Sequence, residues 1–155
     1  MIIVRPAEKK DSKDIFEWRN DKLSRKMSHN SNHIQWADHE YWFENALNSH
    51  DHLLLICHVA QTMEKVGIVR FDIISDYALA SINLSPSMRG KNLASNCLKT
   101  ALSWLKVQKP DILEVKAEIK SINVGSIKAF EAADFVFDKE LDRILFYTYT
   151  FKENF

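Results

Sequence analysis

The apolar positions of the chain recur with two different periods, which predict helices in some segments and strands in others. Asp11 or Ser12 can cap the start of a first helix, because both residue types accept hydrogen bonds from the backbone of a first turn. That helix carries Ile15, Phe16 and Trp18. The pattern therefore predicts an apolar-faced helix near the N-terminus.

Two polar side chains predict the end of this helix. Asn20 and Asp21 compete for backbone hydrogen bonds, so the helix ends or is interrupted there. After a polar stretch, residues 35–47 read as a second helix. Trp36 and Phe43 lie on one face of that helix at helical spacing.

The period changes in the middle of the chain. Residues 53–60, 66–74 and 77–84 are rich in β-branched and aliphatic side chains, which favours strands. Tight polar turns join the three runs, so they predict an antiparallel meander. A short apolar run at residues 2–4, ending before Pro6, predicts an edge strand.

The second half of the chain alternates again between helix and strand. Apolar residues spaced by three and four predict a long helix that begins near Asn92. The remaining elements are a strand at 112–119, a helix at 123–133 and strands at 135–137 and 143–151. The predicted order is βααβββαβαββ, an α+β fold around a mixed, mainly antiparallel sheet in one domain, residues 1–155.

Composition excludes several classes of function. Lys plus Arg and Asp plus Glu each number 21, so the net charge is zero, which argues against nucleic acid and anionic membrane as partners. The apolar run 53–60 is too short to cross a bilayer, and the N-terminus carries no secretion pattern, so we expect a cytoplasmic protein. Cys57 and Cys97 are expected to be buried free thiols. His29 and His33 have the spacing of some zinc ligands, but no cysteine pair precedes them, and we expect no metal.

The segment with the clearest chemistry is a basic turn between a predicted strand and a predicted helix. Backbone N–H groups at a helix start lack partners and carry partial positive charge, which suits a diphosphate. Gly90 and Ala94 are small enough for close approach, and Arg89 and Lys91 add cationic donors. An ordinary basic turn would show the same composition.

Two motifs together indicate a family. INLSPSMRGKNLA resembles the coenzyme-A-binding signature of the GNAT acetyltransferase superfamily, Arg/Gln-x-x-Gly-x-Gly/Ala. SINVGSIKAFEAADF is similar to that family's Asn-x-x-Ser-x-x-x-Tyr-x-x-x-Gly-Phe segment. Both occur in the family's order, and the resemblance covers essentially the whole chain.

The resemblance implies an acetyl-coenzyme A co-substrate bound in a wedge between the strands at 77–84 and 112–119. Backbone amides near Leu84 would hold the thioester carbonyl, and Asn123 would bond the pantetheine arm. The amine would attack directly, without a covalent enzyme intermediate. The implied cofactor-binding residues are Leu84, Met88, Arg89, Gly90, Lys91, Asn92, Leu93, Ala94, Asn123, Ser126, Lys128 and Phe130.

The chain departs from the family pattern at two positions. Asn92 replaces the middle glycine, and asparagine tolerates unusual backbone angles better than most residues. Phe130 replaces the tyrosine that commonly protonates the departing thiolate, and it cannot donate a proton. Either the thiolate leaves unaided, or water or another group supplies the proton, or the protein binds coenzyme A without turnover.

A narrower resemblance concerns the acceptor. FEWRND, HIQWADHEYWF and GIVRFDIIS are similar to the branch that acetylates nucleotide-linked amino sugars in the pseudaminic-acid pathway. This implies a small-molecule acceptor whose 4-amino group is acetylated. Aromatic rings would stack on the sugar or base, and arginines would pair with the diphosphate. The implied substrate-binding residues are Trp18, Arg19, Asn20, Trp36 and Arg70, although tryptophans are also common core anchors.

The sequence leaves open which group removes the proton from the attacking ammonium. His39 and Asp72 are the catalytic candidates, and an ordered water relay would replace both. Three classes of function remain: an amino-sugar acetyltransferase, a protein N-terminal or polyamine acetyltransferase, and a non-catalytic acyl-coenzyme A sensor. The protein is expected to be a monomer or a homodimer.

Overall fold

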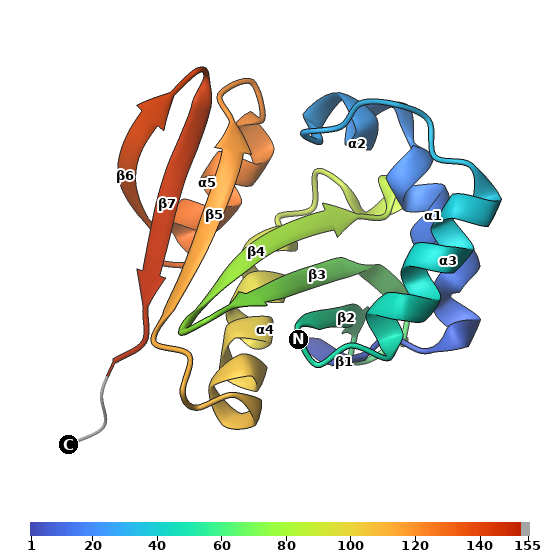
Figure 1. Ribbon diagram of the computed structural model, residues 1–155, viewed down its shortest axis with the longest axis horizontal. Helices are drawn as coiled ribbons and strands as arrows, with labels where there is room; N and C mark the ends of the chain where they lie inside the picture. Colours follow the sequence, from blue (N-terminus) through green and yellow to red (C-terminus); the bar gives the residue numbers. More distant parts are fainter. Residues whose placement is uncertain (153–155) are drawn as a thin grey trace.

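The computed structural model describes residues 1–152, and its centre is a seven-stranded sheet in the order β1-β2-β3-β4-β5-β7-β6 (Figure 1). The strands are β1 (Ile2–Pro6), β2 (His52–Val59), β3 (Lys65–Ile74), β4 (Tyr77–Leu84), β5 (Glu114–Lys120), β6 (Val136–Leu141) and β7 (Ile144–Thr150). The helices are α1 (Ser12–Asn20), α2 (Lys22–Met27), α3 (Trp36–Leu47), α4 (Ala94–Gln108) and α5 (Val124–Ala132), with short 3₁₀ helices at Lys9–Asp11 and Pro86–Met88.

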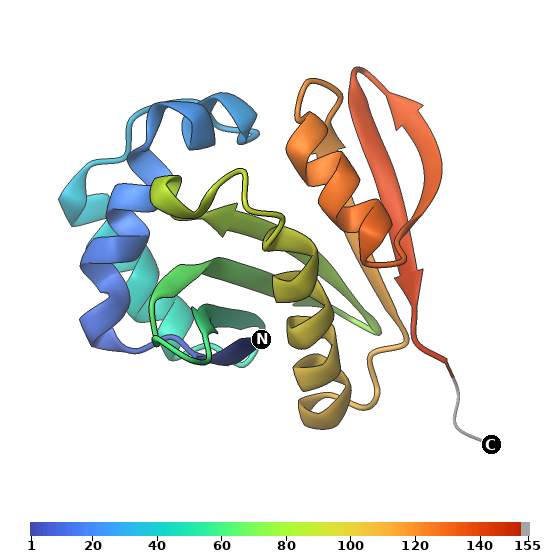
Figure 2. The same ribbon diagram turned by 180° about the vertical axis from the view of Figure 1, so that it is seen from behind.

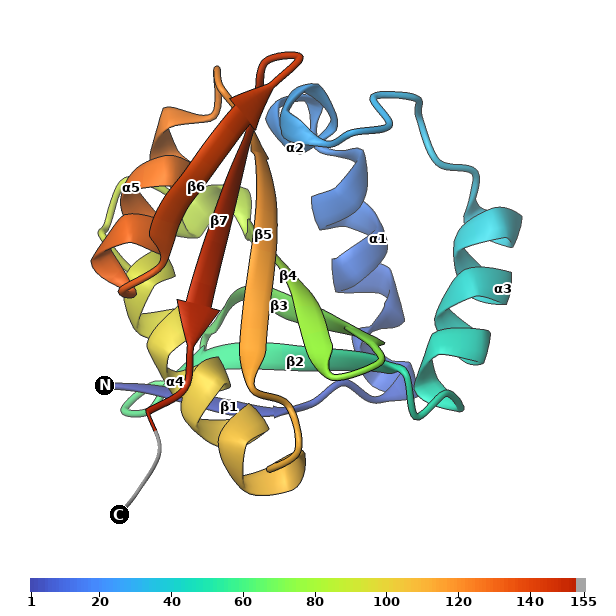
Figure 3. The ribbon, with the colours of Figure 1, turned by 60° about the vertical axis from the view of Figure 1, so that its left-hand side comes forward.

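The sheet is antiparallel except where β4 meets β5. These two strands pair in parallel over three residues each, with Tyr77 opposite Glu114 and Leu79 opposite Lys116. Beyond that pair, β4 continues to Leu84 and β5 to Lys120 with no ladder between them. Figure 1 and Figure 3 show the two strands separating toward their C-terminal ends. The two strands therefore splay apart in the way that the family resemblance implies.

Helices cover both faces of the sheet and divide the core into two clusters. α4 and α5 lie on one face, which Figure 2 shows from behind, and α1 and α3 lie on the other. Alternation along β2 assigns the faces: Leu55 and Cys57 join the α4 side, whereas Leu54 and Ile56 join the α1 and α3 side. Cys57 and Cys97 are buried free thiols, as expected.

The structure differs from the predicted order by one helix and by several boundaries. α2 was not predicted, because its six residues carry no buried side chain and therefore no apolar period. It forms because Asp21 accepts hydrogen bonds from the amides of Leu23 and Ser24. α4 begins at Ala94 rather than near Asn92, whose φ of 57° belongs to the preceding loop.

The last two strands also shift. β6 begins at Val136 and continues to Leu141 instead of ending at residue 137, and β7 spans Ile144–Thr150. β6 is exposed along its whole length and pairs with β7 alone, so its polar residues give no alternating pattern. Within residues 1–152, no helix is long and apolar enough to span a membrane.

Candidate active site

The loop before α4 has the backbone conformation of an anion-binding turn. Gly90 and Asn92 adopt positive φ angles of 74° and 57°. Asparagine is among the residues that tolerate this region, which explains how the loop forms without the middle glycine. No side chain caps the N-terminus of α4, so the amides of its first turn are available to a bound anion.

The side chains of this loop divide between the core, α2 and solvent. Met88 is 5% exposed and packs in the core, so it anchors the loop to the body of the protein. An Nη2 group of Arg89 donates to Asp21 Oδ2 at 2.7 Å and to Ser24 Oγ at 2.8 Å. Arg89 was predicted to face a phosphate, and the structure instead ties it to α2. Lys91 is exposed.

The second predicted motif forms the start of α5. Asn123 caps the helix, because its Oδ1 accepts a hydrogen bond from the Ser126 amide at 3.2 Å. Phe130 is 2% exposed, and its ring meets Phe135 edge to face at 4.9 Å. Position 130 is therefore a core position that supplies no proton to the wedge. Lys128 is exposed on the same helix.

A close backbone approach positions the end of β4 beside the wedge. Gly67 on β3 pairs with Leu84, and a Cβ at this glycine would lie 2.8 Å from Leu84 Cα and even nearer the Asn83 carbonyl. Only glycine fits there without displacing β4. The strand edge that the resemblance assigns to the thioester thus depends on Gly67.

On the opposite face, two arginines stack on one tryptophan. The guanidinium carbon of Arg19 lies 4.1 Å from the centre of a Trp42 ring, and that of Arg70 lies 5.2 Å from it. Arg19 comes from α1, Trp42 from α3 and Arg70 from β3, so three elements build this cation cluster. Arg70 pairs across the ladder with Ser81 of β4, which places the cluster beside the wedge.

The cation cluster carries excess positive charge. Burial and the neighbouring charge of Arg70 lower the pKa of Arg19 to about 10. Arg70 Nε donates to Asp72 Oδ1 at 2.9 Å, whereas Arg19 has no carboxylate within ion-pair distance among residues 1–152. A half-buried arginine with no acidic partner favours an anionic ligand.

His39 supports Arg19 instead of facing a substrate. Its ring is fully buried between α1 and α3. Nδ1 lies 3.2 Å from Arg19 Nη1 and must accept its hydrogen, while Nε2 donates to the Ser12 carbonyl at 3.0 Å. Burial and the charge of Arg19 lower the pKa of His39. The predicted substrate contact of His39 is thus corrected to a positioning role.

Asp72 lies on the same face as the cation cluster, next to the narrow end of the wedge. It pairs across the ladder with Leu79, the last β4 residue bonded to β5. Its Oδ1 accepts hydrogen bonds from Arg70 and, at 2.7 Å, from Nδ1 of His52. The carboxylate therefore holds Arg70 in place.

The other three predicted substrate residues lie outside the cation cluster, and two of them, Trp18 and Asn20, line one hollow beside α1. Trp18 is 7% exposed and belongs to the core beneath α1 and α3. Asn20 exchanges two hydrogen bonds with the backbone of Ile34, at 2.7 and 2.8 Å, and so fixes the chain entering α3. Trp36 is 42% exposed and packs edge to face on Phe16. Trp36 alone among them presents a largely open ring.

A segment that the sequence did not predict crosses the open end of the wedge. We call residues 21–29 the strap. On the β4 side, Ser24 Oγ donates to Asn83 Oδ1 at 2.8 Å. On the β5 side, His29 Nε2 donates to the Glu118 carbonyl at 3.2 Å, and Lys120 Nζ donates to the Lys26 carbonyl at 3.2 Å. Figure 1 shows α2 above the separated strands. Asp21, as a helix-capping residue, was the one sequence signal of this segment.

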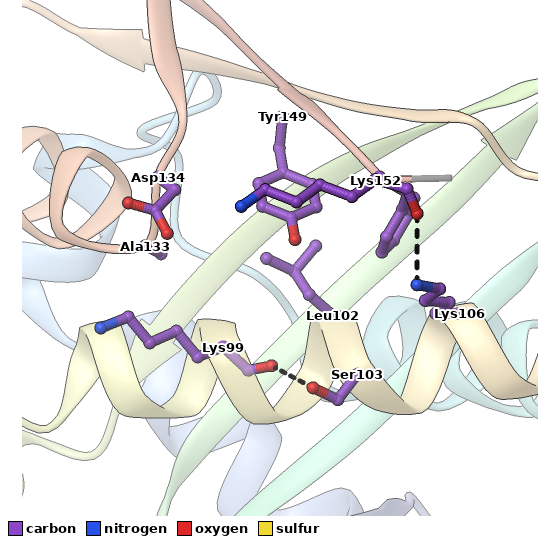
Figure 4. Close-up of a pocket in the computed structure, with 9 residues that line it drawn as sticks. Lys99, Leu102, Ser103, Lys106, Ala133, Asp134, Tyr149 and Lys152 are labelled. Atoms are coloured by element: carbon purple, nitrogen blue, oxygen red, sulfur yellow. Dashed lines mark hydrogen bonds between the residues drawn. The ribbon is translucent and has the colours of Figure 1, made fainter. Parts of the chain in front are cut away.

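Two hollows lie outside the wedge. One of about 550 Å³ lies between α1 and the start of the loop that joins β4 to α4, residues 85–93, which we call the coenzyme loop; Trp18, His33 and Ser85 are among the residues that line it. Another of about 390 Å³ lies between α4 and the end of β7, where Lys99 and Lys152 flank Tyr149 (Figure 4). Neither hollow includes a residue of the cation cluster.

Comparisons with known proteins agree with this geometry. A family model described as an acetyltransferase (GNAT) domain matches residues 1–136. A search of curated proteins found no match. Among solved structures, a domain from Methanocaldococcus jannaschii DSM 2661 is 23% identical with a TM-score of 0.83, covering 97% of this chain and 99% of that chain.

Two further structures are described with their ligands. Spermidine N-acetyltransferase from Vibrio cholerae, in complex with CoA and spermine, is 15% identical with a TM-score of 0.85, covering 96% of this chain and 95% of that chain. An aminoglycoside acetyltransferase in complex with ribostamycin and coenzyme A is 15% identical with a TM-score of 0.81, covering 96% and 93%. At these identities the similarity shows the fold.

The wedge, the glycine turn before α4 and the family match over residues 1–136 lead to one conclusion. This chain belongs to the GNAT acetyltransferase family, whose members use acetyl-coenzyme A as the acetyl donor.

Proposed function

We propose that this acetyltransferase acetylates the amine of a nucleotide-linked amino sugar, at its 4-amino group. Acetyl-coenzyme A enters from the α4 and α5 face, and the acceptor enters from the α1 and α3 face. The two meet in the wedge between β4 and β5.

The coenzyme side follows from the backbone. Free amides at the start of α4, with Gly90 and Asn92 in the turn, hold the diphosphate. The unpaired edges of β4 and β5 accept the pantetheine arm as an added strand. Asn123, the N-cap of α5, and Lys128, in the middle of α5, lie on the same side of the sheet and complete the proposed coenzyme contacts.

The observation that carries the acceptor assignment is the cation cluster. Arg19 and Arg70 both stack on Trp42 beside the wedge, and Arg19 has no acidic partner among residues 1–152. A diphosphate would neutralise both charges with planar, paired hydrogen bonds. Trp36, with its exposed ring, offers a stacking surface for a base or sugar.

The same charges disfavour a polyamine acceptor. Spermine and aminoglycosides carry several positive charges, and two adjacent arginines repel them. A protein N-terminus lacks the phosphate that the arginines favour. The non-catalytic sensor keeps one supporting observation, the burial of Phe130 where the family places a proton donor.

The proposed reaction is direct transfer. The neutral amine attacks the thioester carbonyl, the C–N bond forms, and the C–S bond breaks as the thiolate leaves. Backbone amides of β4 near Leu84 stabilise the oxyanion. Holding both reactants in the wedge contributes about 7–11 kcal/mol to lowering the barrier.

Neutralising the cation cluster tests the acceptor assignment. We expect the double change Arg19→Gln and Arg70→Gln to raise the KM for a UDP-linked 4-amino-dideoxy sugar at least 10-fold, because charged hydrogen bonds are worth about 1.5–3 kcal/mol each. The Kd for acetyl-coenzyme A should stay within twofold, because the cluster lies on the other face of the sheet. Arg143→Gln, on the β6–β7 turn, is the matched control. Unchanged sugar kinetics in the double variant would refute the acceptor site.

A further inference from the structure

We propose that His29 of the strap is the general base that takes the proton from the attacking ammonium. The inference rests on the proposed acetyl transfer in the wedge, but not on which amine is the acceptor.

The position of His29 follows from the topology. The sheet separates the coenzyme loop on the α4 face from the cation cluster on the other face, so the acetyl group can cross only where β4 and β5 are unpaired. The last bonded pair is Leu79 with Lys116. Two residues farther along lie Ser81 on β4 and Glu118 on β5, on opposite sides of the opening. His29 contacts the Glu118 carbonyl there.

Ser81 marks the acceptor side of this opening. It is exposed although it lies within the sheet, and it pairs with Arg70 of the cation cluster. A sugar nucleotide whose diphosphate is held by Arg70 therefore carries its amine toward the opening that His29 borders.

The hydrogen bond of His29 fixes its tautomer. A carbonyl oxygen can only accept, so Nε2 of His29 must carry the hydrogen in the contact with Glu118. In the neutral ring, Nδ1 is then the unprotonated nitrogen. The contact therefore leaves the basic lone pair on the nitrogen that is free to receive a proton.

Contacts along the strap with the coenzyme loop and with β5 hold His29 in place. Asp21 and Ser24 anchor the first turn of the strap to Arg89, and the Lys26 carbonyl accepts from Lys120 of β5. The charged residues closest in sequence to these contacts are Arg25 and Lys26 on the strap and Glu118 and Lys120 on β5. His29 itself is exposed, so substrate can reach it.

The two other candidate bases are already occupied. His39 is fully buried with both ring nitrogens bonded. Asp72 already accepts hydrogen bonds from Arg70 and His52 through one oxygen, and it holds Arg70 in place. His29 is exposed, and its Nδ1 makes no hydrogen bond to a residue of 1–152.

Both protons that the acceptor nitrogen loses are accounted for. The ammonium of the acceptor gives one proton to Nδ1 of His29, which later releases it to solvent. The neutral amine forms the C–N bond, and the C–S bond breaks. The second nitrogen proton ends on the departing thiolate, which leaves as the coenzyme A thiol. No step needs a proton donor at Phe130.

The change His29→Gln tests this role, because glutamine keeps a donor for the Glu118 carbonyl but has no basic nitrogen. We expect kcat with the UDP-linked 4-amino sugar to fall about 100-fold or more. Of the two ionisations that shape the acidic limb of the kcat/KM profile, the one of the general base should disappear, and only the rise that follows deprotonation of the amine should remain. The Kd of acetyl-coenzyme A should not change. His33→Gln, an exposed histidine four residues away, is the control and should retain wild-type kinetics.

A full rate with His29→Gln, or a loss with an unaltered pH profile, would overturn the proposal. If the wild-type protein acetylates another amine instead of the sugar, the acceptor assignment fails and the same profile is measured with that amine. Nitrogen-15 NMR of the wild-type protein bound to coenzyme A gives a reading that needs no acceptor. The proposal expects hydrogen on Nε2 of His29, and a ring with hydrogen on Nδ1 would overturn it.

Discussion

Asp11, the residue before α1, ties the start of this helix to β1 and β3. Its carboxylate is fully buried and accepts hydrogen bonds from two nitrogens of Arg5, at 2.7 and 2.9 Å, and from the Glu8 amide. Lys65 lies 2.7 Å away. Burial alone would raise the pKa of Asp11, but the hydrogen bonds from Arg5 and Lys65 outweigh it and hold the pKa well below its usual range.

Replacing this charge should destabilise the fold. We expect Asp11→Asn to lower the free energy of unfolding at pH 7 by about 3 kcal/mol, because it leaves two cations without their buried partner. Asp14 also pairs with Lys65 but is more exposed. Asp14→Asn should therefore lower the free energy of unfolding by less than about 1 kcal/mol. Urea unfolding of the three proteins measures both values.

The pH dependence has a definite sign. Because the folded pKa of Asp11 is depressed, its contribution is fully present above the unfolded pKa of about 4 and is lost as pH falls toward the folded value. The difference between wild type and Asp11→Asn should therefore shrink from pH 4 downward. A difference that stays constant down to pH 2 would contradict this role.

At the residue scale, the sequence could predict residue types but not their partners. Arg19 and Arg70 were singled out for their charge, and the structure brings them together. Trp42, on which both stack, was missed because its spacing on α3 is equally typical of a core residue. His39 was misassigned for the opposite reason, since the sequence does not show that its ring is fully buried.

At the scale of elements, the strap depends on Asp21, which has two separable functions. Its side chain caps α2 and also pairs with Arg89. Asp21→Asn keeps the cap and weakens the ion pair, whereas Asp21→Ala removes both.

We expect Asp21→Ala to cost about 1 kcal/mol of stability and Asp21→Asn less, because asparagine is an equally good cap. Both changes should raise the acceptor KM, because each loosens the strap over the wedge. Asp38→Ala, an exposed residue in the first turn of α3, is the control. Thermal unfolding and steady-state kinetics measure the two effects, and a wild-type KM in both variants would show that the strap does not shape the acceptor site.

The pairing of β3 with β4 offers a second test at this scale. Gly67→Ala forces a Cβ against the Asn83 carbonyl and Leu84 Cα, so we expect about 2 kcal/mol of destabilisation. The Kd for acetyl-coenzyme A should rise, because the displaced β4 edge borders the wedge. Gly125→Ala in α5, where a Cβ meets nothing within 4 Å, should be neutral or stabilising. Calorimetric titration and urea unfolding compare the two variants, and equal affinities would contradict the assigned β4 edge.

Elements with a strong apolar period were predictable from sequence, and weakly patterned elements were not. α4 presents Leu98, Ala101 and Leu105 at helical spacing, and its existence follows from that pattern. α2 and β6 bury no side chain, so hydrogen bonds and a neighbouring strand determine them instead. The wedge itself followed from the family resemblance, since no local pattern shows where two strands stop pairing.

At the scale of the whole molecule, the sheet acts as a partition with one opening. α4 lies on one face, and α1 and α3, which with β3 carry the cation cluster, lie on the other (Figure 3). This arrangement brings two substrates of very different shape to the same few residues of β4 and β5. Because the cation cluster and the loop before α4 lie on different faces, changes in the cation cluster should leave acetyl-coenzyme A binding unaffected.

Thiol release from acetyl-coenzyme A, measured with three acceptors, decides which amine the enzyme acetylates. The acceptors are a UDP-linked 4-amino-dideoxy sugar, spermidine and a ribosomal-protein N-terminal peptide. We expect rapid turnover with the sugar nucleotide alone, because only that acceptor carries a diphosphate for Arg19 and Arg70. Turnover with spermidine or the peptide, but not with the sugar nucleotide, would contradict the acceptor assignment.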